Sequence, residues 1–470
     1  IMSTPLRYAA GLQFVVLTDH GDGTRLEPPA YRSGVLIIDG VEISTTRGHY
    51  GAVGLTASPY PLGGEAREVA EDVERLGGFG FVAHGDSPKG ELSWSDWAIP
   101  FAGLEIVNLD TVWRAAGRLE LARAMATYWL RGPETLAALV DRPVALLDQW
   151  DAAATTRRVV GLASADAHGG WIPGYRTCFS TVTTRAELDA PLSGDAKADA
   201  EAIVRALRRG HLYIAIDGFE RSPQFTFSAS IDSQRARQGE VLPEGSPVRL
   251  DIAIAEREGA QLRLLRDGLV VRAVTGSHLT YVADGGRAAY RAEVRLPTTK
   301  GTAAPWILSN PIYVGDPDRP RGAVMAPGIG PALPIAPDSW HTEHEPTSEG
   351  AIESLPAGLR FRFRIGTDAS RSPFSAIGSV PPASVVPYDR ISVTARADRP
   401  LRLLVMFRAR GDGDPPRWAR SIYLDQTDRT YTLPVSDLRP MTPNTAAVAP
   451  RDQIGTLLLV VDSVNTAPGT

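Results

Sequence analysis

The chain has 470 residues, a formal net charge of −5, eight histidines and a single cysteine, Cys178. This length exceeds what one hydrophobic core supports, and we expect three domains. The slightly acidic balance gives no basic field for nucleic acid, and no apolar run approaches the roughly 20 residues that cross a bilayer. One cysteine excludes an intrachain disulfide and a cysteine-based zinc cluster.

Residues 1 to 220 alternate short apolar runs with helical patterns. The apolar runs are "FVVL" (14–17), "GVLIIDGVEIS" (34–44), "FGFVAHG" (79–85), "AGLEIVN" (102–108) and "RVVGLASADAH" (158–168). Each ends in polar residues, which is typical of parallel strands that are buried on both faces. Between two of them, Val69, Val73 and Leu76 recur at helical spacing before a Gly-Gly stop. A further helix is predicted to end at Gly210, with a last strand over residues 212–216.

The pattern changes after Phe219, because helical spacing disappears and strand-like runs alternate with turn residues. We expect an Ig-like β-sandwich over residues 221–316. Residues 317–339 are rich in Pro and Gly, which predicts an extended linker. Residues 340–470 are again β-like and predict a second β-sandwich or jelly roll.

Four histidines fall at or just after strand ends within the first 170 residues: His20, His49, His84 and His168. Carboxylates accompany them at Asp19, Glu42 and Asp166. A single histidine of this kind is most often a surface or hydrogen-bonded residue. Four strand ends with ligand-type side chains are improbable by chance, and the carboxyl ends of parallel barrel strands converge on one face. Imidazole and carboxylate suit Zn, Mn or Fe, so the sequence predicts a metal site.

Five motifs in order resemble the PHP (polymerase and histidinol phosphatase) superfamily. They are "VVLTDH" (15–20), "GVEIST" with the following "GH" (40–49), "FVAHGD" (81–86), "GLEIVN" (103–108) and "ASADAH" (163–168). The run "AIVRALRRGHLYIAIDG" (202–218) also resembles the usual end of that domain. The resemblance covers residues 1 to about 220. It implies an α/β fold, a distorted (β/α)7 barrel, here followed by two all-β sandwich or jelly-roll domains.

The resemblance also implies a ligand set for two or three divalent metal ions, Zn, Mn or Fe. Carried over residue by residue, the ligands would be His20, Glu42, His49, His84, Asp166 and His168, with Glu42 bridging two ions. Asp19 would be a catalytic partner beside them. We further expect substrate contacts from Arg25, Lys89, Asn108 and Arg114, and Arg47 and Arg176 are further candidate cations on the same rim.

Two departures from the family pattern stand out. Gly85 follows His84 where many relatives have proline. The family also opens with a strand carrying a His-x-His pair and then a Ser-Asp-Gly turn, which would lie just before Ile1. Because a barrel without its first strand would leave an unpaired edge, we expect the natural protein to continue upstream of Ile1. A degenerate homologue that has lost this motif is the alternative.

The resemblance implies hydrolysis by a metal-activated hydroxide, with phosphomonoesters or phosphodiesters as the first expectation. Cleavage of an amide, carbamate or ester at the same site stays open, as does a non-catalytic binding or scaffold role. The appended β domains resemble the multidomain carbaryl-hydrolase-type branch, which implies a periplasmic or secreted bacterial protein. We expect a small-molecule substrate, no nucleic acid and no membrane span, and for the last domain either carbohydrate contact or oligomerisation.

Overall fold

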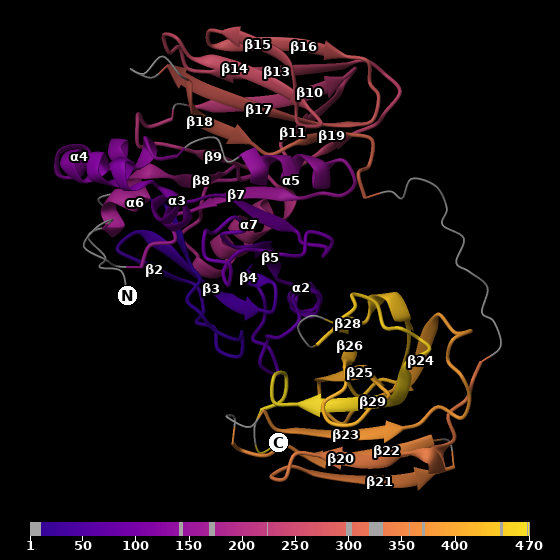
Figure 1. Ribbon diagram of the computed structural model, residues 1–470. Coiled ribbons are helices and arrows are strands. Elements are labelled where there is room, and N and C mark those ends of the chain that lie inside the picture. Colours follow the sequence, from indigo (N-terminus) through magenta and orange to yellow (C-terminus); the bar gives the residue numbers. More distant parts are fainter. Residues whose placement is uncertain are drawn as a thin grey trace. The chain divides into compact units, whose positions relative to one another are not determined.

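The computed structural model describes residues 11–140, 144–168, 174–222, 224–297, 303–318, 332–356, 358–368, 372–441, 445–467 and 469 (Figure 1). The chain divides into two compact units. The first contains residues 1–21, 25–56 and 65–323, and the second contains residues 22–24, 57–64 and 324–470. Most of the linker predicted over residues 317–339 lies outside the described residues, at 319–331.

A seven-stranded sheet forms the base of the first unit. Its strands are β1 (Phe14–Leu17), β2 (Ala30–Arg32), β3 (Val35–Thr45), β4 (Gly48–Val53), β5 (Phe79–Val82), β6 (Gly103–Asn108) and β7 (Val160–Ser164). The order is β1-β3-β4-β5-β6-β7, with β2 also paired to β3. The pairs β1–β3, β5–β6 and β6–β7 are parallel, whereas β2–β3, β3–β4 and β4–β5 are antiparallel. The sheet is therefore mixed.

The antiparallel part of this sheet corrects the expected β/α alternation. β3 and β4 form a hairpin in which Thr45 lies opposite Gly48, and the Thr45 hydroxyl donates to the Gly48 carbonyl at 2.6 Å. Gly48 has φ +117°, a conformation that a side chain would strain. The chain thus reverses within two residues instead of crossing over through a helix. The structure is mixed α/β, but the (β/α)7 barrel is not confirmed.

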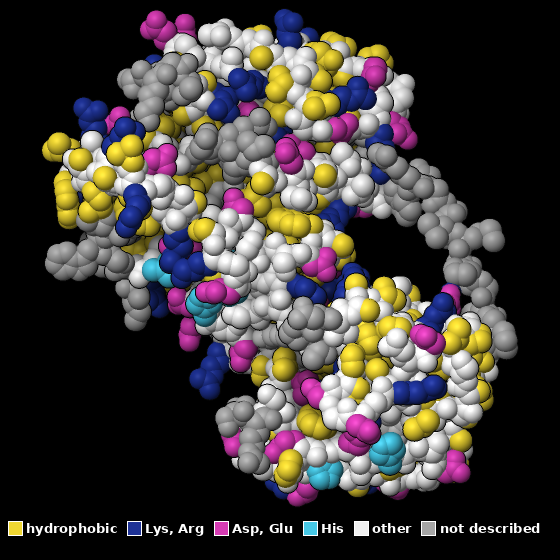
Figure 2. Space-filling view, in the orientation of Figure 1, with side chains coloured by type: hydrophobic (Ala, Val, Ile, Leu, Met, Phe, Trp, Pro, Cys, Tyr) yellow, Lys and Arg dark blue, Asp and Glu magenta, His cyan; other side chains and the backbone are white. Residues whose placement is uncertain are grey.

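Six helices occur among the described residues: α2 (Ala66–Arg75), α3 (Leu109–Ala115), α4 (Arg118–Ala137), α5 (Val144–Ala154), α6 (Tyr175–Thr181) and α7 (Ala196–Arg209). α2 buries Val69 and Val73, as its spacing predicts. α7 is capped by the Asp195 side chain and ends at Gly210 in the left-handed conformation, the predicted stop. Figure 2 shows hydrophobic side chains gathered over α4, where Trp129 is 72 % exposed.

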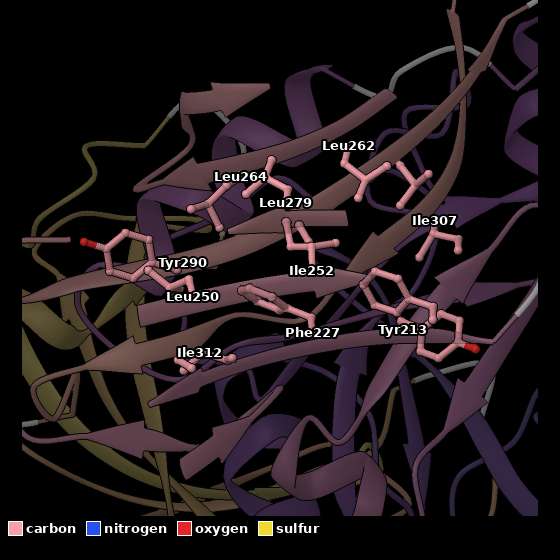
Figure 3. Close-up of a cluster of buried hydrophobic side chains, with 14 of the residues drawn as sticks. Tyr213, Phe227, Leu250, Ile252, Leu262, Leu264, Leu279, Tyr290, Ile307 and Ile312 are labelled. Atoms are coloured by element: carbon pink, nitrogen blue, oxygen red, sulfur yellow. The ribbon is translucent and has the colours of Figure 1, made fainter. Parts of the chain in front are cut away.

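A β-sandwich completes the first unit. Its strands are β8 (Thr183–Ala186), β9 (Leu212–Ala215), β10 (Phe225–Ile231), β11 (Gln234–Arg237), β12 (Val241–Leu242), β13 (Val248–Ile254), β14 (Gln261–Arg266), β15 (Leu269–Thr275), β16 (His278–Ala283), β17 (Ala288–Pro297), β18 (Ala303–Ser309) and β19 (Ile312–Val314). Buried Phe227 and Ile252 meet Leu262 and Leu264 in its core (Figure 3). β9 pairs with β18, so the boundary predicted at residue 220 does not separate two sheets.

A buried ion network joins α5 to this sandwich. Arg291 on β17 donates from Nε and Nη2 to the two oxygens of Asp151 on α5, at 2.7 and 2.8 Å. Its Nη1 donates to Glu293 at 2.7 Å. Arg291 is 1 % exposed and Glu293 is fully buried. Such charges are stable inside a protein only when they are paired and hydrogen-bonded, as these are.

The second unit is built from strands, and its described residues include short 3-10 helices at Pro337–Ser339 and Val435–Asp437. The strands are β20 (His341–His344), β21 (Glu349–Leu355), β22 (Gly358–Arg364), β23 (Phe374–Ser379), β24 (Arg390–Ala395), β25 (Leu401–Ala409), β26 (Arg417–Leu424), β27 (Arg429–Pro434), β28 (Arg439–Pro440) and β29 (Ile454–Asp462). The main sheet has the order β20-β23-β29-β25-β26-β28. Within the described part of the chain, no helix is long and apolar enough to cross a membrane.

Candidate metal centre

Glu42 stands at the centre of a buried group of imidazoles. It lies on β3, His49 lies on the adjacent strand β4, and His84 follows β5. The Nδ1 atom of His49 is 2.6 Å from Glu42 Oε1, and the Nε2 atom of His84 is 2.8 Å from the same oxygen. All three residues are less than 10 % exposed. Two rings from different strands therefore converge on one carboxylate oxygen.

The charges of this group follow from its contacts. Burial alone would raise the pKa of Glu42, but the hydrogen bonds from His49 and His84 outweigh it and lower that pKa to about 2. Burial would lower the pKa of His84, but Glu42 raises it to about 9. The Nδ1 atom of His84 lies 3.1 Å from the Leu92 carbonyl oxygen, which orients the ring and directs Nε2 toward Glu42. Glu42 thus stays ionised at neutral pH.

His20 joins this group from the end of β1. The Glu42 amide donates to the Asp19 carbonyl, and the Gly21 amide donates to the Glu42 carbonyl, both at 3.1 Å. The His20 and His49 ring centroids are 5.1 Å apart. Ligand atoms of His20, Glu42 and His49 all lie within 4.8 Å of one another. Histidine side chains reach the surface of this unit beside acidic and basic ones (Figure 2).

A second group of ligand-type side chains comprises Asp110, Asp166 and His168, whose ligand atoms also lie within 4.8 Å of one another. Asp166 and His168 follow β7, and Asp166 Oδ1 is 3.6 Å from His168 Nε2. Burial raises the pKa of Asp166. Asp110 is a residue that the sequence reading missed. Its signal is weak, because it follows the "GLEIVN" strand by two residues and sits inside the first turn of α3.

Glu105 and Asn108 on β6 connect the two groups. Glu105 Oε2 accepts from the His84 backbone amide at 2.8 Å and from Asn108 Nδ2 at 2.9 Å. Asn108 Nδ2 also donates to Asp166 Oδ2 at 3.1 Å, and Asn108 Oδ1 accepts from the Thr111 amide at 2.9 Å. Asn108 is 4 % exposed. Its amide is fully engaged by the protein, which leaves no free donor for the substrate contact that we expected of it.

Two of these residues have an uncommon backbone conformation. His84 has φ +33° and Asp166 has φ +41°, both in the region that non-glycine residues rarely adopt. Surrounding contacts must hold such residues in place, and they cluster at functional sites. Both are predicted metal ligands. The His84 backbone amide is hydrogen-bonded to Glu105, and the Asp166 carboxylate is hydrogen-bonded to Asn108.

The predicted catalytic and substrate-binding residues have different surroundings. A cavity of about 1250 Å³ is lined by Asp19, His20, Glu42, Glu105, Asp166 and His168, among others. Arg25 and Lys89 are exposed, and Arg114 is hydrogen-bonded to Asp110. Of the described cations, those lining the cavity are Arg32, Arg185 and Arg221, which the sequence reading missed. Arg185 is already paired with Asp217 at 2.7 Å.

Glu105 was also missed as a site residue. It is 5 % exposed, and burial raises its pKa to about 7. A glutamate inside an otherwise apolar strand could have been recognised, since burying a carboxylate is costly unless it serves a purpose. The two remaining candidate cations of the sequence reading lie apart from the ligands. Arg47 is half-buried, 3.6 Å from Glu65, and Arg176 is exposed on α6.

No protein-family model matches the chain. No curated protein matches it either. One similar solved structure is a two-domain protein from Bacteroides vulgatus ATCC 8482 that contains a predicted PHP-like metal-dependent phosphoesterase. It is 14 % identical, with 65 % of this chain and 89 % of that chain covered and a TM-score of 0.27.

Two further similar structures are family 11 carbohydrate-binding modules from Clostridium thermocellum. The module of the cellulosomal cellulase Lic26A-Cel5E is 17 % identical, covering 28 % of this chain and 80 % of that chain, with a TM-score of 0.23. The other, in complex with a β-1,3-1,4-mixed-linked tetrasaccharide, is 16 % identical, covering 28 % and 81 %, with a TM-score of 0.23. Similarities at this level assign neither a family nor an activity to the chain.

Proposed function

We propose that the chain is a metal-dependent hydrolase whose ions bind at the Glu42 group. The observation that carries the proposal is the convergence of His49 and His84 on one ionised oxygen of Glu42, with His20 beside them. Imidazole nitrogens and carboxylate oxygens form a ligand set that suits Zn, Mn or Fe, and no thiolate takes part. The donor set and its burial fit a divalent cation.

Asp110, Asp166 and His168 offer a second metal position in the same region. Divalent ions bound at both positions would supply the Lewis acid that activates water at neutral pH and stabilises negative charge on a leaving oxygen. Asp166 and His168 line the cavity together with Glu42 and Asp19. A substrate in the cavity would therefore contact both groups of ligands.

The chain's own residues have distinct parts in this proposal. Glu42 would hold its ion as a carboxylate, because its pKa of about 2 keeps it ionised at neutral pH. Asp19 is exposed on the cavity wall next to His20, where its carboxylate would accept a proton from the attacking water. The residues that line the cavity lie between Gly11 and Thr226, and its volume is large enough for a small organic substrate.

A phosphoester is the first substrate class that we propose, since paired cations stabilise charge on a phosphoryl group. A carbamate, amide or carboxyl ester is the second. The observation that favours it is the apolar wall of the cavity, formed by Phe14, Val16, Phe79 and Leu162. The apolar side chains would accommodate a neutral aryl group.

The test measures bound metal and turnover in the same samples. Protein loaded with Zn, Mn or Fe is analysed for metal content and then assayed with p-nitrophenyl phosphate, bis-p-nitrophenyl phosphate and an aryl carbamate. We expect bound metal and turnover of one of these classes. Absence of bound metal would refute the proposal, and turnover of the carbamate alone would select the second substrate class.

A matched pair of variants makes the test specific to the Glu42 group. Glu42→Gln keeps the volume of the side chain and removes its charge. We expect this variant to lose a bound ion and to lose turnover by about 100-fold or more. Glu343→Gln is the control, because Glu343 also accepts from an imidazole, His341, at 2.9 Å, but lies in the second unit. The control should keep metal and turnover. Equal behaviour of the two variants would contradict the assignment.

A further inference from the structure

Glu105 is a carboxylate buried within an apolar strand, between Leu104 and Ile106, which are also buried. Its partners are a backbone amide and a side-chain amide, so no permanent cation offsets the cost of burying it. Such a group persists only where its contacts are needed. The contacts of Glu105 lead to both groups of candidate ligands.

One oxygen of Glu105 holds both of its donors. Oε2 accepts hydrogen bonds from the His84 backbone amide and from Asn108 Nδ2. The Nδ2 group of Asn108 also donates a second hydrogen bond, to Asp166 Oδ2. The chain of bonds therefore runs from His84 through Glu105 and Asn108 to Asp166. This path connects the Glu42 group to the Asp110–Asp166–His168 group.

The residues at both ends of this path, His84 and Asp166, have a positive φ angle. His84 and Asp166 both need outside contacts to hold φ at +33° and +41°. The parallel registers place these contacts, since Val82 pairs with Leu104 and Asn108 pairs with Ser164. A hydrogen bond to the backbone amide of His84 fixes its conformation directly, and a bond to Asp166 Oδ2 fixes the direction of that carboxylate.

We propose that Glu105 and Asn108 are positioning residues that hold His84 and Asp166 together and thereby couple the two metal positions. The inference rests on the proposed function, because it concerns the same site. Neither residue acts on the substrate. An ion at one position fixes one end of the path, which orders the ligand at the other end and strengthens binding there.

The test is a titration of metal-free protein with Zn2+ in competition with a chromophoric chelator, which reads affinity without reference to turnover. Wild-type protein should bind two ions with positive coupling. Glu105→Leu removes the acceptor, and Asn108→Ser keeps an oxygen to cap α3 but removes both amide donors. Each should lower Zn2+ affinity at both positions by about 10- to 100-fold and abolish the coupling.

Two further variants separate positioning from mere packing. Glu105→Gln retains an acceptor oxygen and should restore most of the affinity lost in Glu105→Leu. The double variant of Glu105→Leu and Asn108→Ser should bind no more weakly than the weaker single variant, because both break one path. Additive losses, or a Glu105→Leu protein that binds both ions as the wild type does, would overturn the inference.

Asp199→Asn provides the matched control. Asp199 is a buried carboxylate that accepts from two backbone amides, those of Ser193 and Gly194, and from the Tyr31 hydroxyl, but it is not bonded to a candidate ligand. The Asp199→Asn protein should be less stable than the wild type and should still bind both ions. Loss of metal in this control would contradict a specific path. If wild-type protein itself binds no Zn2+, the proposed function fails as well, which distinguishes the two failures.

Discussion

The first unit contains two buried charge networks with different composition. At the contact between α5 and β17, Arg291 supplies a permanent cation to Asp151 and Glu293. In the candidate metal centre, the acids Glu42, Glu105 and Asp166 are partnered by imidazoles, amides and backbone groups. Arg295 Nη1 also lies 3.9 Å from Glu293 Oε2, so two guanidinium groups balance the two carboxylates of the first network. The second has its carboxylates beside imidazoles and amides, with no Lys or Arg bonded to Glu42, Glu105 or Asp166 in the described residues, and a metal ion could take the place of the imidazole protons.

The largest expected effect comes from breaking the self-contained network. Arg291→Met would remove the cation bonded to Asp151 and leave Glu293 with the more distant Arg295, which should cost about 3 to 5 kcal/mol of unfolding free energy. Urea denaturation of the first unit measures it. Metal content of the folded fraction should not change. Replacing all three residues by Met or Leu together should restore much of the loss, and a single-variant loss below about 1 kcal/mol would contradict this account.

The second prediction concerns the pH dependence of the metal-free protein. His84 has a folded pKa raised from 6.5 to about 9, so its contribution is present below pH 6.5 and is lost as pH rises through 9. Glu105 has a folded pKa raised from 4.5 to about 7, so ionising it also disfavours the fold as pH rises from 4.5 to 7. Glu42 acts oppositely, because its stabilisation is present above pH 4.5 and is lost as pH falls toward 2.

Glu105 and His84 thus bind more protons in the folded state than in the unfolded state, Glu105 between about pH 4.5 and 7 and His84 between about pH 6.5 and 9. Each group contributes a fall in stability of at most about 1.4 kcal/mol per pH unit. The measurement is unfolding free energy against pH for wild type and Glu105→Gln, both treated with chelator. The difference between the two curves should change between pH 4.5 and 7. A difference that stays constant over that range would contradict the raised pKa of Glu105.

A smaller effect tests how tightly the sheet is packed beside Glu42. Gly51 lies opposite Glu42 on β3 and opposite Phe81 on β5, and a Cβ atom at Gly51 would lie 2.2 Å from the Phe81 ring. Gly51→Ala should therefore displace that ring and cost about 1 to 3 kcal/mol. Gly90→Ala is the control, since no other atom would lie within 4 Å of a Cβ atom at that position. Equal melting temperatures for the two variants would contradict the packing argument.

The smallest effect is expected at an exposed ion pair on the sandwich. Arg249 donates to Asp251 at 2.8 and 3.0 Å, but its side chain is 56 % exposed. Arg249→Gln should change the unfolding free energy by less than about 1 kcal/mol, and the change should vanish at high salt. A loss as large as that of Arg291→Met would remove the distinction between buried and exposed networks.

The sequence predicted the positions of β3 and β6 well, but it did not predict which neighbouring strands are antiparallel. The run predicted over residues 34–44 became β3 (Val35–Thr45), and the run over 102–108 became β6 (Gly103–Asn108). Burial preference is local, so apolar runs reveal it. The reversal between β3 and β4 depends on a two-residue turn at Thr46 and Arg47, which carries none of the usual Asn-Gly or Asp-Gly signal.

The candidate site also contains residues that the sequence predicted and residues that it did not predict. His20, Glu42 and His49 could be grouped from their positions after or within strands, and the structure places their ligand atoms within 4.8 Å of one another. Glu105 stands out in the sequence only as a carboxylate in an apolar strand, and the bonds that link it to His84 and Asn108 come from the fold. Asp110 gives almost no local signal, because its ligand neighbours Asp166 and His168 are distant in sequence. The pairing of β9 with β18 is equally non-local, since it joins residues 212–215 to residues 307–309.

The shared sheet has a consequence for how this protein can be divided. A gene fragment ending near residue 220 would encode β9 with its β18 edge open and Asp151 without Arg291. An open strand edge invites pairing with other chains, and the orphaned charge weakens the fold, so the fragment should aggregate when expressed. A fragment for expression should therefore keep the candidate metal centre and its sandwich together, from β1 to β19.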